Sequence, residues 1–323
     1  MNSSISSSDA RTSLAVFVTV FFCGVLLLAV ASEWLLRREV LPQDDFSAHK
    51  RLFQNAEQRN ASFGDSHVAR GLVPETGAVN LAYPSEGIAH IALKVRAYFA
   101  EKAPGTVILP ADPHLLSSYR LANRPNPDYL EELNSPADPS WDKLLILDPR
   151  YRSRLAQLWL RYLLSGGELV SKVEILPNGA MLSPGDLSAP DSAWRAYASR
   201  DRVRLHRTGA RKQVEAEKQL FSRLLDDLAE KGARICLVTF PLSPDYRNAM
   251  KATYSDQERS DWHKSLAFFE AEARRVGGRH VDLHAAVQDR SLFRDVDHLN
   301  SHGALIYSEE INRRCAEIPA TGS

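Results

Sequence analysis

The segment Ala61-Ser62-Phe63-Gly64-Asp65-Ser66-His67 begins as an apolar stretch and becomes a polar turn within a few residues. We expect residues 61–63 to form the first strand of a sheet, with Ser66 just past the carboxyl end of that strand. Open parallel sheets present their functional sites at this edge. Ser66 is therefore the first candidate for chemistry.

The rest of the chain alternates between short apolar runs and amphipathic stretches. This alternation is typical of an α/β domain in three layers, with a parallel sheet covered by helices on both faces. The expected strands are residues 61–63, 78–81, 106–109, 234–240 and 279–283. The expected helices are residues 88–99, 212–231, 255–276 and 303–315.

The N-terminal region predicts a membrane segment. Residues 1–12 are Ser-rich and polar, which predicts a disordered tail, and residues 13–36 are almost entirely apolar, which is long enough to cross a bilayer as a helix. A cleaved signal peptide is the alternative, because Ala29-Val30-Ala31 has the small-x-small pattern that precedes a cleavage site. We favour an uncleaved anchor followed by a linker and short helix over residues 37–60.

Two arguments about the orientation of this anchor oppose each other. Arg37 and Arg38 follow the apolar segment and only Arg11 precedes it, which favours a cytoplasmic domain by the positive-inside rule. Long domains, however, cross membranes largely regardless of flanking charge. We expect the domain to face the periplasm or the cell exterior.

A single folded domain is expected over residues 61–318, with an insertion at about 112–211. The insertion contains several prolines and an amphipathic stretch at residues 151–164 that predicts a helix. We interpret it as a segment beside the active site that shapes specificity or binds a partner. The alternative is additional core.

Composition excludes some functions. Forty basic residues balance forty acidic ones, so the chain has no electrostatic footprint for nucleic acid. A basic cluster at residues 200–212 is expected to be a solvated face, with binding of an anionic polymer or lipid head group as the alternative. Cys236 and Cys315 are interpreted as small buried residues rather than a disulfide bridge, and Cys23 lies in the apolar N-terminal segment.

The sequence offers partners for Ser66 near its C-terminus. A serine hydroxyl is a poor nucleophile unless a base lies within hydrogen-bond reach and a third group orients that base. His298 and Asp295, three residues apart, supply a base and an orienting carboxylate, and Asp297 is a second candidate for the orienting role. A metal site formed by these side chains with His302 is less favoured, because it leaves the serine motif unexplained. We expect neither a metal nor a cofactor.

Two blocks carry a resemblance to a known family. The segment from Ala61 to His67 resembles the first motif block of the SGNH (GDSL-like) hydrolase superfamily, and Asp295-x-x-His298-Leu299-Asn300-x-x-Gly303-Ala304 resembles its last block. The resemblance implies a three-layer, flavodoxin-like fold. It also implies that Ser66 attacks an ester carbonyl, that His298 acts as base and then acid, and that Asp295 orients His298.

The family's middle blocks are altered in this sequence. Relatives stabilise the oxyanion with the N–H group of the serine, a glycine in the second block and an asparagine in the third. Here Asn80-Leu81-Ala82 places alanine at the glycine position, and Pro110-Ala111-Asp112-Pro113-His114 lacks the asparagine. A backbone group or another side chain takes its place, or the reaction is slower or different. The candidate oxyanion or substrate contacts are Asn80, Ala82, Asp112, His114, Asn300 and His67.

The anchor and the two end blocks together are similar to the membrane-anchored proteins of alginate O-acetylation and teichoic-acid D-alanylation. This similarity implies serine-dependent O-acyl transfer to a cell-envelope polysaccharide or a lipid-linked acceptor. It also implies a polytopic membrane-bound O-acyltransferase as a partner. The alternatives are an esterase or lipase-like hydrolase of glycan or lipid esters, and a non-catalytic scaffold in polysaccharide assembly.

Overall fold

The protein consists of two compact units. The first is built from described residues within 1–48 and 136–171, and the second from those within 49–135 and 172–323. The expected insertion is therefore divided, since its middle belongs to the first unit and its two ends to the second. The computed structural model describes residues 7–40, 44–136, 144–147, 155–156, 159–160 and 173–318.

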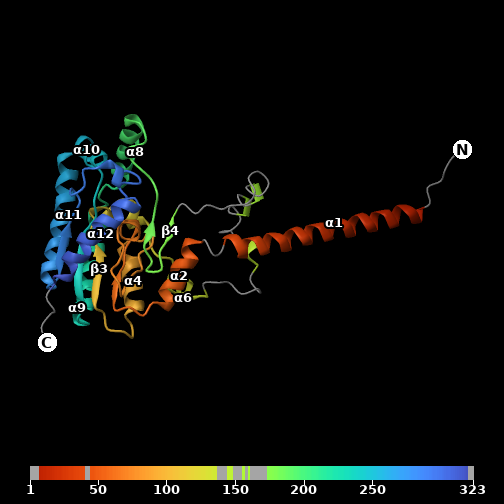
Figure 1. The fold of residues 1–323 in the computed structure, drawn as a ribbon, viewed down its shortest axis with the longest axis horizontal. Coiled ribbons are helices and arrows are strands. Elements are labelled where there is room, and N and C mark those ends of the chain that lie inside the picture. Colours follow the sequence, from red (N-terminus) through yellow and green to blue (C-terminus); the bar gives the residue numbers. More distant parts are fainter. Residues whose placement is uncertain are drawn as a thin grey trace. The chain divides into compact units, whose positions relative to one another are not determined.

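The first unit contains helix α1, Ser7–Leu35, which continues into the π-helix η1, Leu36–Val40 (Figure 1). The span Leu14–Glu39 is long and apolar enough to cross a membrane. Its large apolar side chains up to Val30 are exposed. A helix that is apolar all round is stable where lipid or protein covers it. Residues 7–12 are helical, so the prediction of a disordered tail is wrong for them: the helix extends from the apolar segment into its polar flank.

Part of the expected insertion packs against the end of this helix. Leu145 forms a buried apolar cluster with Leu36, and Trp159 Nε1 donates a hydrogen bond to Ser32 Oγ at 3.1 Å. Most of the expected helix over 151–164 lies outside the described residues. The described residues Leu145 and Trp159 thus contact the end of the N-terminal helix.

The second unit is organised around a parallel sheet with strand order β2-β1-β3-β6-β7 (Figure 1). The strands are β1 Asn60–Ser62, β2 Ala78–Asn80, β3 Thr106–Pro110, β6 Arg234–Thr239 and β7 Arg279–Asp282. All five expected strands are confirmed to within one residue at each end. Counted along the chain, the order is 2-1-3-4-5, which is that of flavodoxin-like sheets.

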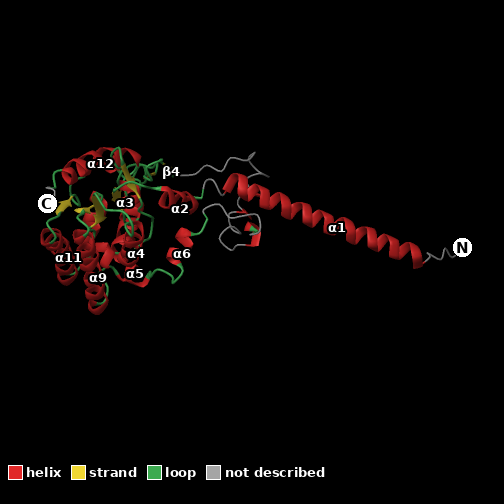
Figure 2. Cartoon of the chain, turned by 90° about the horizontal axis from the view of Figure 1, so that it is seen from below, coloured by secondary structure: helices red, strands yellow, loops and turns green. Residues whose placement is uncertain are grey.

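Helices cover both faces of this sheet. The covering helices are α3 Ser66–Gly71, α4 Ile88–Tyr98, α9 Arg211–Glu230, α11 Asp256–Arg275 and α12 Ser301–Ala316. Successive strand residues point to opposite faces. Accordingly, Val107 and Leu109 pack with α4, α9 and α11, whereas Ile108 packs with α3 and α12. Figure 2 shows the strands between α12 on one side and α9 and α11 on the other. The domain therefore has three layers, as expected.

Two helices of ten or more residues were not expected from the sequence. Helix α8, Ser192–Leu205, buries only Ser199 and Val203 of its side chains, so its apolar periodicity is weak. Helix α10, Pro244–Thr253, begins directly after the loop that follows β6. The remaining elements are α2 Asp45–Asn55, η3 Pro113–Leu116, α5 Ser118–Ala122, α6 Tyr129–Asn134, η4 Leu145–Leu147, β4 Glu174–Ile175, β5 Met181–Leu182 and η5 Arg290–Leu292.

A disulfide joins the sheet to the C-terminal helix. Cys236 on β6 and Cys315 on α12 are bonded, with their Cα atoms 5.6 Å apart. The interpretation of these cysteines as separate core residues is therefore wrong. Both are buried, as expected, but 79 residues separate them in sequence, and only the packing of α12 on β6 brings them together.

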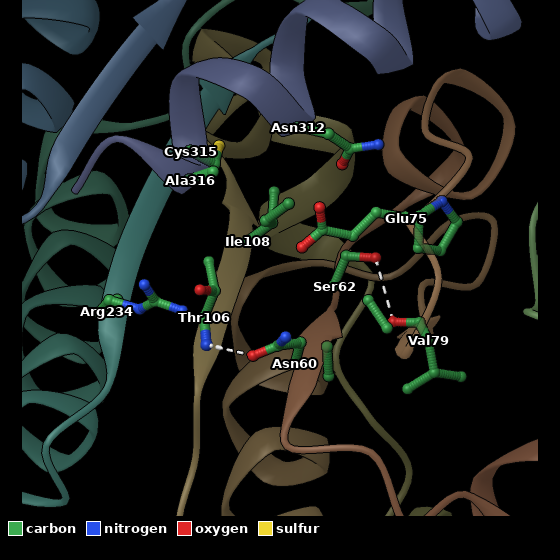
Figure 3. Close-up of a pocket in the computed structure, with 13 residues that line it drawn as sticks. Asn60, Ser62, Glu75, Val79, Thr106, Ile108, Arg234, Asn312, Cys315 and Ala316 are labelled. Carbon is green, nitrogen blue, oxygen red and sulfur yellow. Dashed lines mark hydrogen bonds between the residues drawn. The ribbon is translucent and has the colours of Figure 1, made fainter. Parts of the chain in front are cut away.

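A small cavity lies at the amino-terminal end of the sheet, opposite the edge that carries Ser66. It encloses 40 Å³, far less than the roughly 300–1,000 Å³ of ordinary ligand pockets. Figure 3 shows two hydrogen bonds in its wall: Thr106 N–H donates to Asn60 Oδ1 at 2.8 Å, and Ser62 Oγ donates to the Val79 carbonyl at 3.4 Å. These bonds tie β1 to its two neighbours and leave little space for a ligand.

Candidate active site

The candidate active site lies where β1 and β3 diverge. The chain leaves β1 towards β2 and leaves β3 towards β6, so this is the topological switch point at which open α/β sheets bind ligands. Ser66 follows the end of β1 as the first residue of α3, and Asp112 follows the end of β3. Asp112 Oδ1 accepts a hydrogen bond from Phe240 N–H at 2.9 Å, which ties the ends of β3 and β6 together.

Gly64 sets the sharp turn that presents Ser66. Its φ of +155° lies in the region that favours glycine, and a Cβ atom there would approach Val68 Cγ2 to 2.4 Å. The Gly64 carbonyl also accepts a hydrogen bond from Tyr83 N–H at 2.9 Å. No other residue type fits this turn without displacing the start of α3.

Ser66, His298 and Asp295 form a continuous hydrogen-bonded chain. Ser66 Oγ lies 2.9 Å from His298 Nε2, and His298 Nδ1 lies 2.9 Å from Asp295 Oδ1. The Asp295 carboxylate also accepts hydrogen bonds from the backbone N–H groups of Asp297 and His298, at 3.2 and 3.0 Å, which fixes its position. With Nδ1–H donating to Asp295, Nε2 is free to accept the serine proton. The structure thus brings Ser66 to a pair of residues more than two hundred positions away in the sequence.

Asp297 adds a second carboxylate on the buried side of His298. Its Oδ1 lies 3.4 Å from His298 Nδ1 and 3.3 Å from Arg202 Nε. Burial alone would raise the pKa of Asp297, but the neighbouring His298, a hydrogen bond from His67 and the Arg202 guanidinium lower it well below its usual range. Asp295 is the better hydrogen-bond partner of His298, and its side chain is 28% exposed against 1% for Asp297. Asp295 therefore contacts His298 from a partly exposed position, and Asp297 contacts it from a buried one.

His67 is buried between two carboxylates. Its Nδ1 lies 3.1 Å from Asp112 Oδ2, and its Nε2 lies 3.6 Å from Asp297 Oδ2. Burial by itself would lower the pKa of His67, yet Asp112 and Asp297 raise it to about 10. The ring is thus a cation at neutral pH, with both N–H groups directed at carboxylates. Its ring centroid lies 5.1 Å from that of His298.

A further pair of interactions fixes Asp65. Its Oδ2 accepts hydrogen bonds from His114 Nε2 and Arg120 Nη2, both at 2.6 Å, and its Oδ1 accepts one from His67 N–H at 3.0 Å. Burial would raise the pKa of Asp65, but Arg120 and His114 lower it well below its usual range. Burial also lowers the pKa of His114 and of His206, whose rings stack 4.8 Å apart.

The charges of this buried network balance. The carboxylates of Asp65, Asp112 and Asp297 are matched by the guanidinium groups of Arg120 and Arg202 and by the His67 cation, while His114 and His206 are neutral. The balance matters because an unpaired charge in a buried site costs several kcal/mol. The hydrogen-bonded chain of Ser66, His298 and Asp295 adjoins this network, whose charges already sum to zero.

The described residues contain two groups that could hold a metal ion. One is Asp65, His67 and His114, and the other is His67, Asp297 and His298. Neither includes His302, which the sequence hypothesis had placed in a metal site. A metal in the first group would displace Arg120 from Asp65, and one in the second would displace the His67 proton. The partners present thus favour ion pairing over coordination.

The side chains expected at the oxyanion make their hydrogen bonds elsewhere. Asn80 Nδ2 donates to the Val68 and Leu72 carbonyls, at 2.9 and 2.8 Å, and Asn80 Oδ1 accepts from Ala82 N–H at 3.0 Å. Asn300 caps helix α12, accepting from Gly303 N–H at 2.9 Å. These bonds occupy the Ala82 N–H group and both asparagine amides.

The remaining candidates are also engaged, because His67, Asp112 and His114 belong to the buried network. The N–H group of Ser66 is different. As the first residue of α3 it has no acceptor within the helix, so it stays a candidate donor for an oxyanion at Ser66.

The space beside Ser66 is narrow. A crevice of 10 Å³ is bounded by Ser66, His298, Phe240, Pro241 and Leu299. This volume is about that of one water-sized probe. The groups that form it are nearly buried, since Ser66 is 8% exposed and His298 is 6% exposed. Low exposure strengthens the interactions among the polar groups around the serine.

Three residues of the network were missed by reasoning from the sequence. Arg202 and His206 are contributed by α8 and the residue that follows it, within or beside the basic cluster that was expected to be solvated. Arg120 lies on α5, inside the expected insertion. No sequence spacing marks these residues, because their partners Asp65 and Asp297 are remote in the chain.

Comparison with known proteins adds no assignment. The sequence matches no protein-family model and no curated protein. The functional interpretation of the site therefore rests on its own geometry and chemistry.

Proposed function

We propose that the protein is a membrane-anchored, SGNH-type serine O-acyltransferase that modifies a cell-envelope glycan. The observation that carries the proposal is the chain from Ser66 Oγ through His298 to Asp295, with both links at 2.9 Å. This is the arrangement that activates a serine for attack on a carbonyl carbon. The position of Ser66 at the switch point of the sheet supports it.

The proposed reaction has two half-reactions. Ser66 Oγ attacks the carbonyl carbon of an acyl donor while its proton passes to His298 Nε2, and collapse of the tetrahedral intermediate transfers that proton to the leaving group. The acyl group is then an ester of Ser66. A hydroxyl of the glycan gives its proton to His298 as it attacks this ester, and the proton returns to Ser66 as the acylated glycan leaves. The Ser66 N–H group stabilises the oxyanion in both steps.

Asp295 and Asp297 support the positive charge that forms on His298 in each half-reaction. Asp295 fixes the ring through a hydrogen bond, and Asp297 contributes charge from the buried side. The His67 cation keeps Asp297 ionised without competing for Ser66. This division of roles explains why Asp295 and Asp297 both lie within reach of His298 Nδ1.

The N-terminal helix favours transfer over hydrolysis. A domain held at the membrane by α1 is placed to receive an acyl group from a membrane-bound O-acyltransferase. The Cys236–Cys315 bridge supports a location on the oxidising, outer side, where disulfides persist. We therefore propose a single-pass anchor with the domain facing the periplasm or the exterior.

Trapping of the acyl-enzyme tests this function. The full chain in detergent is incubated with an activated acetyl ester, and its intact mass is measured beside that of Ser66→Ala. An acetyl adduct on the unaltered protein alone, released on addition of a glycan with formation of the acetylated glycan, supports transfer. Release of free acetate at the same rate with and without glycan would identify a hydrolase. A folded protein that forms no adduct would identify a scaffold.

A further inference from the structure

A second cavity opens at the same edge of the sheet as Ser66. It encloses 570 Å³ between helix α10, helix α11 and the loop that follows β7. This volume is in the range of about 300–1,000 Å³ that is usual for ligand sites, unlike the crevice at the serine. The residues of its wall that bear on the argument are Arg247, Lys251, Arg259, Trp262, His263 and His284.

This cavity is close to the reacting serine. Pro241 bounds the crevice at Ser66, and Pro244 bounds the second cavity. Three residues of chain span at most about 11 Å, so the two spaces are neighbours. Between them, Ser243 Oγ donates a hydrogen bond to the Val296 carbonyl at 2.6 Å, which ties the dividing loop to the segment that carries His298.

The charge of the wall is of one sign. The residues that line the cavity include no Asp or Glu. Arg247 Nη1 donates to the carbonyls of Leu242, His284 and Val287 at 3.0, 3.3 and 3.0 Å. Its Nη2 donates to Gln288 Oε1 at 2.7 Å. These acceptors orient the guanidinium without neutralising it. Its Nε–H and one hydrogen on Nη2 are not used by these bonds.

Neighbouring carboxylates do not compensate this charge. No carboxylate within residues 173–318 or the other described segments forms an ion pair with Arg247 or Lys251. Asp256 is engaged by Arg259, and Asp282 by His284 at 2.7 Å. Because Asp282 takes Nδ1 of His284, Nε2 is the nitrogen left for a ligand. The His284 ring packs edge-on against Trp262, with centroids 4.9 Å apart, and so adds an aromatic wall.

Another cavity of similar size shows that this pattern is not general. A space of 610 Å³ between α9 and α11 is also lined by basic residues. There, Lys218 lies 3.5 Å from Glu215, and Lys264 lies 3.5 Å from Asp261. Both lysines of that wall thus face a carboxylate of the same wall, which weakens its attraction for an anion.

The basic cluster singled out in the sequence is also partly neutralised. Arg202 contacts Asp297 at 3.3 Å and Arg207 contacts Glu258 at 3.0 Å. Within the described residues, Arg247 and Lys251 in the wall of the second cavity are cations for which no carboxylate partner is found.

We propose that this second cavity is the acceptor subsite and binds an acidic sugar residue, one that carries a carboxylate or a phosphate. Arg247 and Lys251 contact the anionic group, and the wall of Trp262 and His284 contacts the ring. The neighbouring hydroxyl of the glycan then reaches acyl-Ser66 across the dividing loop. This inference rests on the proposed acyl transfer and names the class of its acceptor.

Binding of defined oligosaccharides tests the subsite. The full chain, in nanodiscs of zwitterionic phosphatidylcholine, is titrated calorimetrically with a galacturonic acid hexamer, phosphorylated maltohexaose and neutral maltohexaose. We expect one or both acidic probes to bind and the neutral probe to bind at least about tenfold more weakly. A preference between the acidic probes identifies the group as carboxylate or phosphate. Equal binding of all three, or binding of none, overturns the proposal.

Two lysines provide a matched pair of variants. Lys251→Glu reverses a charge in the proposed subsite, whereas Lys264→Glu reverses one in the cavity between α9 and α11. We expect Lys251→Glu to weaken binding of the acidic probe by about tenfold or more and Lys264→Glu to change it less than about twofold. Equal effects of the two variants would mean diffuse attraction and overturn the proposal. Arg247→Lys, which keeps the charge but not the hydrogen-bond geometry, should weaken binding less than Lys251→Glu.

Acylation of Ser66 by the activated ester is measured on the same samples. Because Lys264 lies in the other cavity, outside the proposed subsite, Lys264→Glu should acylate Ser66 at the unaltered rate. Normal acylation without acidic-glycan binding would overturn the subsite while leaving the proposed function intact. Binding without acylation of Ser66 would overturn the proposed function instead.

Discussion

Two buried polar clusters of the second unit differ in what they leave unsatisfied. In the first, Lys94 Nζ contacts both carboxylate oxygens of Glu86, at 2.5 and 2.6 Å, and lies 3.3 Å from His49 Nε2. Tyr129 donates to the same carboxylate at 2.5 Å. In the second, the network around Asp65, Asp112 and Asp297 ends at His298 and Ser66, which border the crevice.

The first cluster is a closed structural ion pair, whereas the second ends in a hydrogen-bonded chain at the crevice. The polar groups of the Lys94 cluster are directed at one another, and burial shifts both members towards neutrality, raising the pKa of Glu86 and lowering that of Lys94. The buried charges of the Ser66 cluster sum to zero. The cluster ends at the His298 imidazole, whose hydrogen-bond partner at Nε2 is the Ser66 hydroxyl rather than a charged group. Such a chain can accept a proton without breaking an ion pair.

The largest expected effect separates the clusters by activity. Ser66→Ala removes the nucleophile, so we expect the rate of acyl-enzyme formation to fall by at least about 10³-fold. The measurement is the time course of the acetyl adduct by intact mass. Ser62→Ala, at the end of β1 and four residues before Ser66, is a matched control, since the Ser62 hydroxyl donates to a carbonyl at 3.4 Å. Comparable loss in both variants would count against a nucleophilic role for Ser66.

A change in the other cluster should affect stability instead. Lys94→Met leaves the buried Glu86 without its cation, so we expect the free energy of unfolding to fall by about 3–5 kcal/mol. Denaturant titration of the full chain measures it. The double variant Lys94→Met/Glu86→Gln should recover part of the loss, because no charge then remains buried. If the folded fraction of Lys94→Met fails to acylate Ser66, the two clusters are not separate.

The His67 cation predicts a pH dependence of stability. Its pKa in the folded protein is about 10, above the 6.5 of a free histidine. A group with a raised pKa stabilises the folded state fully below the lower value and loses that contribution as pH rises through the higher one. Between pH 7 and pH 9.5, stability should therefore fall by up to about 1.4 kcal/mol per pH unit on account of His67.

The variant His67→Gln isolates this contribution from that of other titrating groups. Denaturation midpoints of the two proteins, measured across the same pH range, should converge as pH rises. Parallel curves would show that His67 is neutral in the folded protein and would remove the charge balance described for the network.

The smallest effect concerns a residue at the edge of the site. Asn300→Ala removes the cap of α12, which should lower the free energy of unfolding by about 1–2 kcal/mol. The rate of acyl-enzyme formation should change little, because the Asn300 amide is engaged with backbone groups. Asn300→Ser keeps a capping oxygen and should restore part of the stability. A large loss of acylation in folded Asn300→Ala would instead identify Asn300 as an oxyanion donor.

Much of the sheet could be predicted from the sequence because its signals are local. A buried strand such as β6 is a continuous apolar run, and α9 repeats its apolar residues at helical spacing, so both were placed within a residue or two. Helices α8 and α10 escaped prediction because one buries few side chains and the other is short. The position of Leu145 was not set locally either, since its buried neighbours Leu35 and Leu36 lie on α1 and η1.

The sequence by itself identified Ser66, His298 and Asp295 as candidate site residues, because Ser66 lies in one short motif and Asp295 and His298 in another. Only the tertiary structure decided what surrounds them. Arg120, Arg202 and His206 reach the site from segments that the sequence predicted to be an insertion or a solvated surface. Cys236 bonds to Cys315, which lies 79 residues away in the sequence. The physical reason is that burial removes water from every polar group at once. The partners of each group are therefore set by whichever side chains the packing of sheet and helices brings within hydrogen-bond distance.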